Sequence, residues 1–99
     1  METELSIVDN EFLRQFECTI DGELAKIEYS QQDRKIFLTK LVMSSELKEK
    51  GYMEPFIAKV LEIIKEREIS VMPTSPAVVR YMKKHRRKYK SMLPVGINI

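Results

Sequence analysis

Residues 48–56, KEKGYMEPF, combine charged residues and one glycine directly before a segment with a helical apolar pattern. A helix N-terminus attracts phosphate because its first N–H groups lack partners and its dipole end is positive. Gly51 could take the positive φ of a phosphate-binding turn, and the two lysines beside it would add cations. Glu54 would repel a phosphate, and Pro55 has no N–H to donate. Two interpretations stay open: a phosphate-binding turn, or an ordinary loop glycine between solvated lysines.

Few other side chains have the chemistry of a reacting group. Ser75 could act as a nucleophile, but the sequence shows no basic partner for its activation, and a role as helix N-cap explains it. His85 is the only histidine and Cys18 the only cysteine, so we expect neither a metal site nor a disulfide. Cys18 fits a strand core, and His85 fits the dipole-stabilised end of a basic helix.

Charge is distributed unevenly along the chain. Residues 80–99 carry seven Lys or Arg and no acidic residue, and all seven lie between Arg80 and Lys90. Residues 1–79 carry ten Lys or Arg and fifteen acidic residues. Charges of +7 and −5 give the net charge of +2. Such a cluster can attract a nucleic acid, an acidic lipid surface or a phosphorylated cofactor, or it can be a solvated helix end. No helix-turn-helix spacing, zinc ligands or aromatic platform indicates specific nucleic-acid recognition, so such binding would be non-specific and salt-dependent.

The first half of the chain has the pattern of an antiparallel meander. Residues 12–20 alternate, with Phe16, Cys18 and Ile20 on one side. The Asp-Gly pair at 21–22 is a strong hairpin signal, and residues 23–30 alternate again. Residues 36–43 are nearly all apolar or β-branched, which predicts a central strand covered on both faces.

The second half changes period. Apolar residues recur at helical spacing from Met53 to Ile64, with Pro55 in the first turn. A short strand ending at Pro73 follows, and then a helix from Pro76 to Tyr89 with Ser75 as N-cap. The predicted order is β-β-β-α-β-α, in which a right-handed crossover makes the fourth strand parallel to the third. Such neighbours, where they splay apart, form a ligand-binding cleft at their carboxyl ends.

Length and composition set further limits. Ninety-nine residues with 43% apolar content predict one α+β domain over residues 1–99. No apolar run is long enough to span a membrane, and the acidic N-terminus has no signal-peptide pattern. We therefore expect a soluble, cytoplasmic protein without a membrane partner. The apolar tail from Met92 could be an added strand or a packed extension, and the protein a monomer or a homodimer formed through it.

From Phe16 to Pro94 the chain resembles the short single-domain branch of the GNAT N-acetyltransferase superfamily. The resemblance rests on the element order, the DGELA hairpin (residues 21–25), and VMPTSPAVVRYMKKHRRKY after the fourth strand. It implies acetyl-CoA in the splayed cleft and direct attack of an amine on the thioester. Lys48 holds the first position of the superfamily's phosphate loop, with Gly51 as its first glycine. Met53 stands where a second small residue is usual.

The resemblance also implies a set of site residues. The thioester carbonyl would lie against the third strand at Leu41, Val42 and Met43. Backbone N–H groups around Gly51 would cradle the pyrophosphate, and Tyr81 would protonate the leaving thiolate, with Ser75 as a second candidate. The phosphate loop would comprise Lys48, Lys50, Gly51, Tyr52 and Met53. The acceptor would be a small-molecule or protein amine.

Several positions depart from the family pattern, and they leave a second hypothesis open. Glu49 stands where another glycine is usual, Lys40 where the branch tends to carry a histidine, and Ser75 where it carries a cysteine. The alternative is a non-catalytic GNAT-like interaction module. It would use its basic C-terminal helix to bind an acidic partner or nucleic acid.

Overall fold

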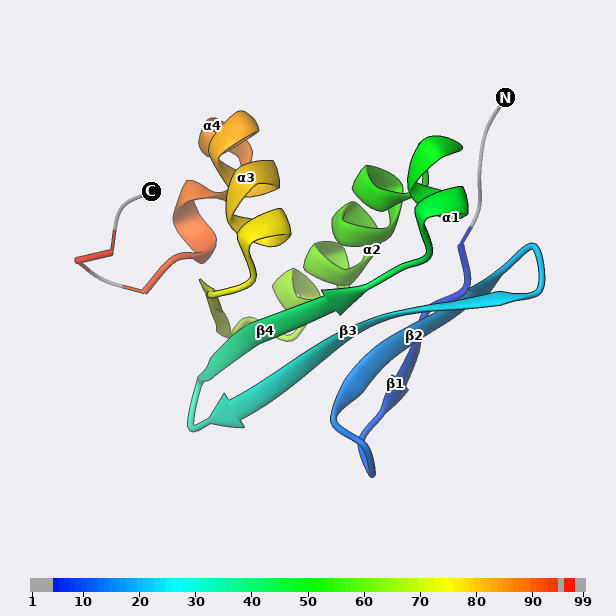
Figure 1. The fold of residues 1–99 in the computed structure, drawn as a ribbon. Coiled ribbons are helices and arrows are strands. Elements are labelled where there is room, and N and C mark those ends of the chain that lie inside the picture. Colours follow the sequence, from blue (N-terminus) through cyan, green and yellow to red (C-terminus); the bar gives the residue numbers. More distant parts are fainter. Residues whose placement is uncertain (1–4, 95, 98–99) are drawn as a thin grey trace.

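The computed structural model describes residues 5–94 and 96–97 and has two layers, an open sheet with helices on one of its faces (Figure 1). The strands are β1 (Val8–Asn10), β2 (Gln15–Ile20), β3 (Glu23–Gln32), β4 (Lys35–Val42) and β5 (Ser70–Pro73). The helices are α1 (Ser45–Glu49), α2 (Met53–Glu66), α3 (Pro76–Lys84) and α4 (Arg86–Tyr89), followed by the 3-10 turn η1 (Lys90–Met92). Within the described ranges, no helix has the length and apolar character needed to cross a membrane.

The sheet has the strand order β1-β2-β3-β4-β5, antiparallel up to β4. β5 pairs with β4 in parallel, which confirms the predicted crossover and the mixed α+β class. The Asp-Gly hairpin between β2 and β3 is also confirmed. Asp21 and Gly22 have φ values of 51° and 79°, and Ile20 pairs with Glu23 across the turn. Both turn residues need the left-handed region, which Asp and Gly tolerate best.

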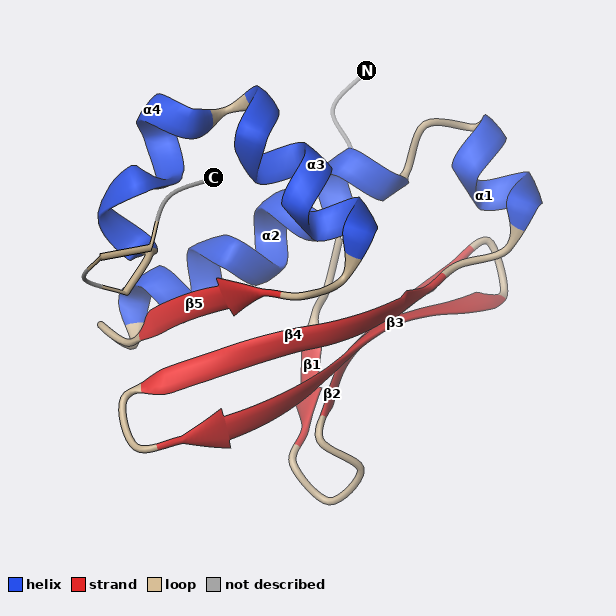
Figure 2. Cartoon of the chain, turned by 60° about the vertical axis from the view of Figure 1, so that its left-hand side comes forward, coloured by secondary structure: helices blue, strands red, loops and turns tan. Residues whose placement is uncertain are grey.

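β4 is not covered on both faces, so that prediction was wrong. Ile36 and Leu38 are fully buried against the helices, whereas Thr39 and Lys40 are exposed. The reason is that helices cover a single face of the sheet in both views, which leaves the other face to solvent (Figures 1 and 2). The apolar run of β4 therefore includes residues such as Phe37 and Leu41 that are only half-buried.

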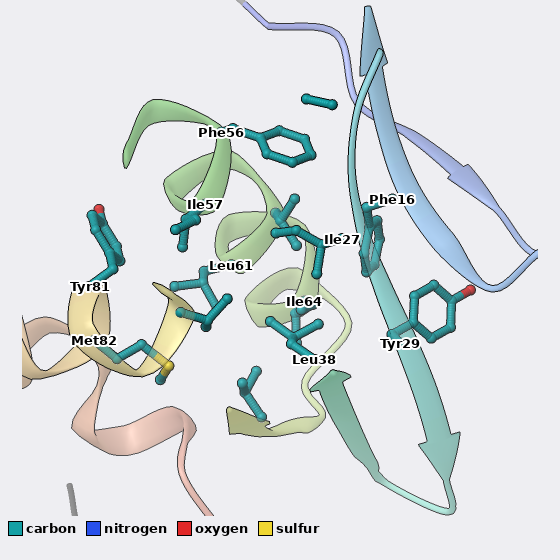
Figure 3. Packing of buried hydrophobic residues seen from close by; sticks show 14 of the residues in the cluster. Phe16, Ile27, Tyr29, Leu38, Phe56, Ile57, Leu61, Ile64, Tyr81 and Met82 are labelled. Atoms are coloured by element: carbon teal, nitrogen blue, oxygen red, sulfur yellow. The ribbon is translucent and has the colours of Figure 1, made fainter. Parts of the chain in front are cut away.

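α2 provides the central element of the core. Its buried side chains recur at spacings of three and four residues, as an amphipathic helix requires. Figure 3 shows this stripe facing the sheet at Ile27 and Leu38, with Met82 of α3 nearby. The buried residues of α2 are Phe56, Ile57, Val60, Leu61 and Ile64, each with no exposed surface.

The sequence did not predict β1 or α1, and it placed the residues of α4 in one continuous helix with α3. Lys48 and Glu49 were placed in a loop but form the last turn of α1. In the tail, Met92 and Pro94 are buried, so the described part is a packed extension and not a strand. Val95, Asn98 and Ile99 lie outside the described residues.

The predicted second helix breaks at His85, whose φ of −116° and ψ of 41° are not helical, and α4 leaves in a different direction (Figure 2). The break has a packing reason. The hydroxyls of Tyr81 and Tyr89 are 3.2 Å apart, and both side chains are buried. In a straight helix, residues eight positions apart are about 12 Å apart along the axis and could not make this contact.

β1 pairs with β2, and its residue Asp9 also connects it to β3 and to the end of α2. Its carboxylate accepts a hydrogen bond from the Tyr29 hydroxyl at 2.7 Å and pairs with the Arg67 guanidinium at 2.8 Å. Burial, followed by the hydrogen bond to Asp9, raises the pKa of Tyr29 to about 12. Asp9, Tyr29 and Arg67 line a polar hollow of about 430 Å³ beside the C-terminus of α2.

We predict that the stability contributed by Tyr29 is lost at alkaline pH. An unfolded tyrosine loses its proton near pH 10, whereas folded Tyr29 retains it to about pH 12. Between these values the folded state binds more protons, so the stability contributed by Tyr29 is full below pH 10 and is lost as the pH rises to 12. Urea unfolding should show wild type more stable than Tyr29→Phe at pH 8, with the difference shrinking towards pH 12. Tyr52→Phe is the control, and a difference that did not change with pH would contradict this account.

Candidate functional site

The β4–β5 ladder ends at Leu38, and beyond it β4 pairs with β3 alone. The two strands pair from Lys35 and Ser70 to Leu38 and Pro73, while β4 runs on to Val42. At the end of the ladder, the Leu38 carbonyl accepts from the backbone N–H groups of Thr74 (3.1 Å) and Ser75 (2.9 Å) and from the Thr74 hydroxyl (2.9 Å). These bonds turn the chain out of the sheet and fix the start of α3.

An irregularity in β4 lies next to this point. Leu38 pairs with Tyr29 of β3, but the next pair joins Lys40 to Glu28, so Thr39 is an extra residue on β4. Its hydroxyl donates to the Glu28 carbonyl at 3.2 Å. A bulge of this kind bends the strand and increases its twist. The bend sits at the first residue of β4 beyond its pairing with β5.

Gly51 ends α1 in a Schellman motif. Its φ is 85°, its N–H donates to the Lys48 carbonyl at 3.0 Å, and the N–H of Tyr52 donates to the Leu47 carbonyl at 3.2 Å. A Cβ built on Gly51 would have nothing within 4 Å, so the turn needs glycine for its backbone conformation and not for close approach. Two N–H groups that the sequence assigned to a phosphate are therefore used within the chain.

The start of α2 retains donors of its own. Within the described ranges, the N–H groups of Met53 and Glu54 make no hydrogen bond in the chain, as expected for the first residues of a helix. The next residue, Pro55, has no N–H. Two free backbone donors and the positive end of a 14-residue helix therefore remain.

A pocket of about 320 Å³ opens between the start of α2 and one face of α3. Two cations of α3, Arg80 and Lys84, line it, and the ammonium of Lys84 lies 3.0 Å from the Glu54 carboxylate of α2. The pocket thus places positive charge opposite a helix N-terminus, with one carboxylate between them. Its lining residues are Met53, Glu54, Ile57, Ala77, Arg80, Tyr81 and Lys84.

Tyr81 contributes an ionisable group to this pocket. Its side chain is 8% exposed, its hydroxyl pairs with Tyr89, and its ring lies 4.6 Å from that of His85. Burial, followed by the hydrogen bond with Tyr89, raises the pKa of the Tyr81 hydroxyl well above its ordinary value. The Tyr81 hydroxyl is protonated at neutral pH, and its raised pKa makes it a weaker acid than an ordinary tyrosine.

The other predicted residues are not gathered at this pocket. Lys48 is exposed on α1, and the ammonium of Lys50 lies 3.3 Å from Asp21 and 3.8 Å from Glu46. Tyr52 lines a separate hollow, beside Asp21 and Cys18. Of the predicted phosphate-loop residues, Met53 alone is among those lining the pocket.

The remaining predicted residues lie near the end of the ladder. Leu41 and Val42 form the end of β4, and Met43 is buried just beyond it. Ser75 is the buried N-cap of α3, but its side chain makes no capping hydrogen bond.

Arg80 and Lys84 were predicted only as members of a basic cluster. The signal that places them in the pocket is helical spacing. Ala77, Tyr81 and Lys84 follow one another at four and three residues, and Arg80 precedes Lys84 by four, so all four share one face of α3.

Comparison with known families places the chain in one of them. The family model described as GCN5-related N-acetyl-transferase matches residues 15–92, from the first residue of β2 to the last of η1. The match covers most of the chain, so the protein belongs to this family of acetyltransferases, as the sequence resemblance predicted. A comparison with curated proteins gave no match.

We predict that Gly51→Ala destabilises the protein by about 1 kcal/mol, since alanine is strained at positive φ and the added methyl group would make no compensating contact. Gly51→Asn should lose less, because asparagine tolerates this conformation. Urea unfolding of the two variants and wild type measures both effects. An alanine variant as stable as wild type would contradict the assigned role of the Schellman turn.

Proposed function

We propose that this protein is an acetyl-CoA-dependent N-acetyltransferase that transfers an acetyl group directly to an amine. The observation that carries the proposal is the pocket between α2 and α3. Two residues with free N–H groups at a helix N-terminus and two cations line this one pocket, which is an arrangement suited to a diphosphate. The family match gives the acetyl-transfer chemistry in general terms, while the cofactor and the acceptor are our proposals.

The residues present fit a bound diphosphate. The N–H groups of Met53 and Glu54 would hold its oxygens from one side, and Arg80 and Lys84 from the other. The Glu54 carboxylate opposes this, because it already pairs with Lys84. Both members of that pair are more than half exposed, so it is weakly held and a phosphate can displace the carboxylate.

The reacting end would lie towards the strands. Ala77 is in the first turn of α3, which starts where β5 leaves β4, so the pocket leads towards the part of β4 that is no longer paired with β5. The ladder end and the bulge at Thr39 support the splayed cleft expected from the sequence, with Leu41, Val42 and Met43 beside the thioester. Acetyl-CoA, when bound, supplies an activated acetyl group. Tyr81 holds a proton on its Oη for the departing sulfur.

A titration of ¹⁵N-labelled protein with CoA tests the cofactor claim. We expect the largest amide shifts at Met53 and Glu54, whose N–H groups are free, and smaller ones at Gly51 and Tyr52, whose N–H groups are already bonded. Glu54→Gln should tighten CoA binding roughly fivefold, since it removes one negative charge beside the phosphates.

Glu62→Gln is the matched control for that variant, because it removes the same charge from an exposed position of α2 outside the pocket. Pantetheine, which has no diphosphate, should bind wild type and Glu54→Gln equally. If no amide between Lys50 and Glu54 shifts at millimolar CoA, the cofactor claim is wrong.

Tyr81→Phe should lower kcat about a hundredfold with little change in KM, because it removes the proton donor and preserves the ring packing. Turnover with a panel of small amines and peptides measures this effect. Tyr89→Phe is the control, since it breaks the same hydrogen bond and leaves the Tyr81 hydroxyl in place. Equal losses in the two variants would assign the pair a structural role only.

The second hypothesis, a non-catalytic module of the same fold, has one specific observation in its favour. The N–H groups of Gly51 and Tyr52 are used within the chain, and a carboxylate stands at the start of α2. Absence of both CoA shifts and turnover would favour this second function, whereas turnover with any amine would exclude it. Ser75 as a reacting group and the identity of the acceptor amine stay predictions.

A further inference from the structure

The most one-sided charge on the molecule lies on the segment that we call the basic elbow, residues 83–90. It comprises the end of α3, the break at His85, α4 and the first residue of η1. No acidic residue follows Glu68 in the chain. The cationic side chains of the elbow are all exposed, and they are Lys83, Lys84, Arg86, Arg87, Lys88 and Lys90.

The helix break gathers these charges on one side. An open hollow of about 550 Å³ is lined by the six consecutive residues from Lys83 to Lys88. In a straight helix of 3.6 residues per turn, six consecutive side chains would point around the whole circumference and could not line one concavity. The elbow therefore presents a concave cationic surface that an unbroken helix would not have.

The elbow is built on a packed base. The Tyr81–Tyr89 hydrogen bond and the His85 ring against Tyr81 join its two arms, and Tyr89 and Met92 are buried beneath it. Since the backbone that carries the cations is already ordered, binding an anion there requires ordering of side chains only.

Within the described part of the chain, these charges are mostly unpaired. Lys84 forms an ion pair with Glu54, and the ammonium of Lys88 lies 5.5 Å from the centre of the Tyr89 ring. Among the described residues, no carboxylate pairs with Lys83, Arg86, Arg87 or Lys90. Their positive potential is therefore directed outward.

We propose that the basic elbow binds the phosphate backbone of nucleic acid without sequence specificity. Its exposed side chains are uniformly cationic, whereas its one apolar ring, Tyr89, is buried. A protein partner or a membrane surface would be held by exposed aromatic or apolar anchors, which the elbow does not present. A phosphate backbone needs only spaced cations, and arginine suits it best. Without an exposed aromatic ring, the elbow cannot read bases by stacking.

The proposal does not depend on acetyl-CoA, so it can be tested with the full chain alone. Fluorescence anisotropy with a labelled 20-base-pair DNA duplex of arbitrary sequence is the assay. We expect a micromolar Kd at 50 mM NaCl that is insensitive to sequence. The slope of log K against log salt should be about −4, for four to five phosphate contacts.

The variant Lys83→Gln/Arg86→Gln/Arg87→Gln should weaken duplex binding at least tenfold and lower the magnitude of the salt slope by about 2.7. The matched control is Lys35→Gln/Lys59→Gln/Lys65→Gln. It removes three exposed lysines elsewhere and should retain binding within about threefold, since its lysines lie outside the elbow. Circular dichroism melts confirm that both variants fold.

Three outcomes would overturn the proposal. The first is the absence of duplex binding by wild type at 50 mM NaCl. The second is an equal loss of binding in both triple variants, which would make the attraction a property of net charge alone. The third is tighter binding of polyglutamate or of vesicles containing phosphatidylserine than of the duplex, which would assign the elbow to an acidic protein or a membrane.

Discussion

The carbonyl of Leu38 is the point on which the arrangement of this protein depends. Its three hydrogen bonds from Thr74 and Ser75 end the pairing of β5 with β4 and turn the chain into α3. Because they form at the middle of β4, the second half of that strand has no neighbour on the β5 side among the described residues. The same bonds set the origin of α3, and so which of its residues face the start of α2. The pocket and the basic elbow both follow from this one junction.

The glycine in the turn between α1 and α2 could be required for phosphate binding or for ending α1. The family resemblance predicts a phosphate-binding role for Gly51, whereas in the structure its positive φ serves to close α1. The free N–H groups lie two residues further along, at Met53 and Glu54, and in our proposal they bind an anion together with Arg80 and Lys84 across the pocket. Glu54 then balances part of this positive charge. The pocket therefore has a lower net charge than its cations alone would give.

Local signals in the sequence were sufficient to predict a hairpin and the buried face of a helix. The Asp21–Gly22 pair defines its hairpin through backbone conformation, and the apolar spacing of α2 predicts its buried stripe. The elements that were missed have weak local signals. β1 has three residues and no alternation, and α1 has five residues with Leu47 as its only buried one. The break at His85 has no glycine or proline to mark it, because it follows from the pairing of Tyr81 with Tyr89.

The residues of the candidate site also separate into those that the sequence could predict and those that it could not. The family resemblance predicted roles for Met53 and Tyr81, which line the pocket, and helical spacing could have added Arg80 and Lys84. Lys50 could not be predicted from its neighbours, because its partner Asp21 is 29 residues away in the chain. Whether a lysine beside a glycine meets a ligand or a carboxylate depends on which hairpin folds next to it. That information is in the tertiary structure and not in the motif.

The two outer strands, β1 and β5, have a consequence for how the molecule behaves in concentrated solution. An open sheet exposes unpaired backbone groups at both edges, and long flat edges invite the addition of strands from other molecules. Here β1 has three residues and β5 has four, and β5 ends at Pro73. A proline cannot donate to a further ladder, and strands this short offer few hydrogen bonds to a newcomer. The single-sided sheet is thus protected against edge-to-edge aggregation by the brevity of its outermost strands.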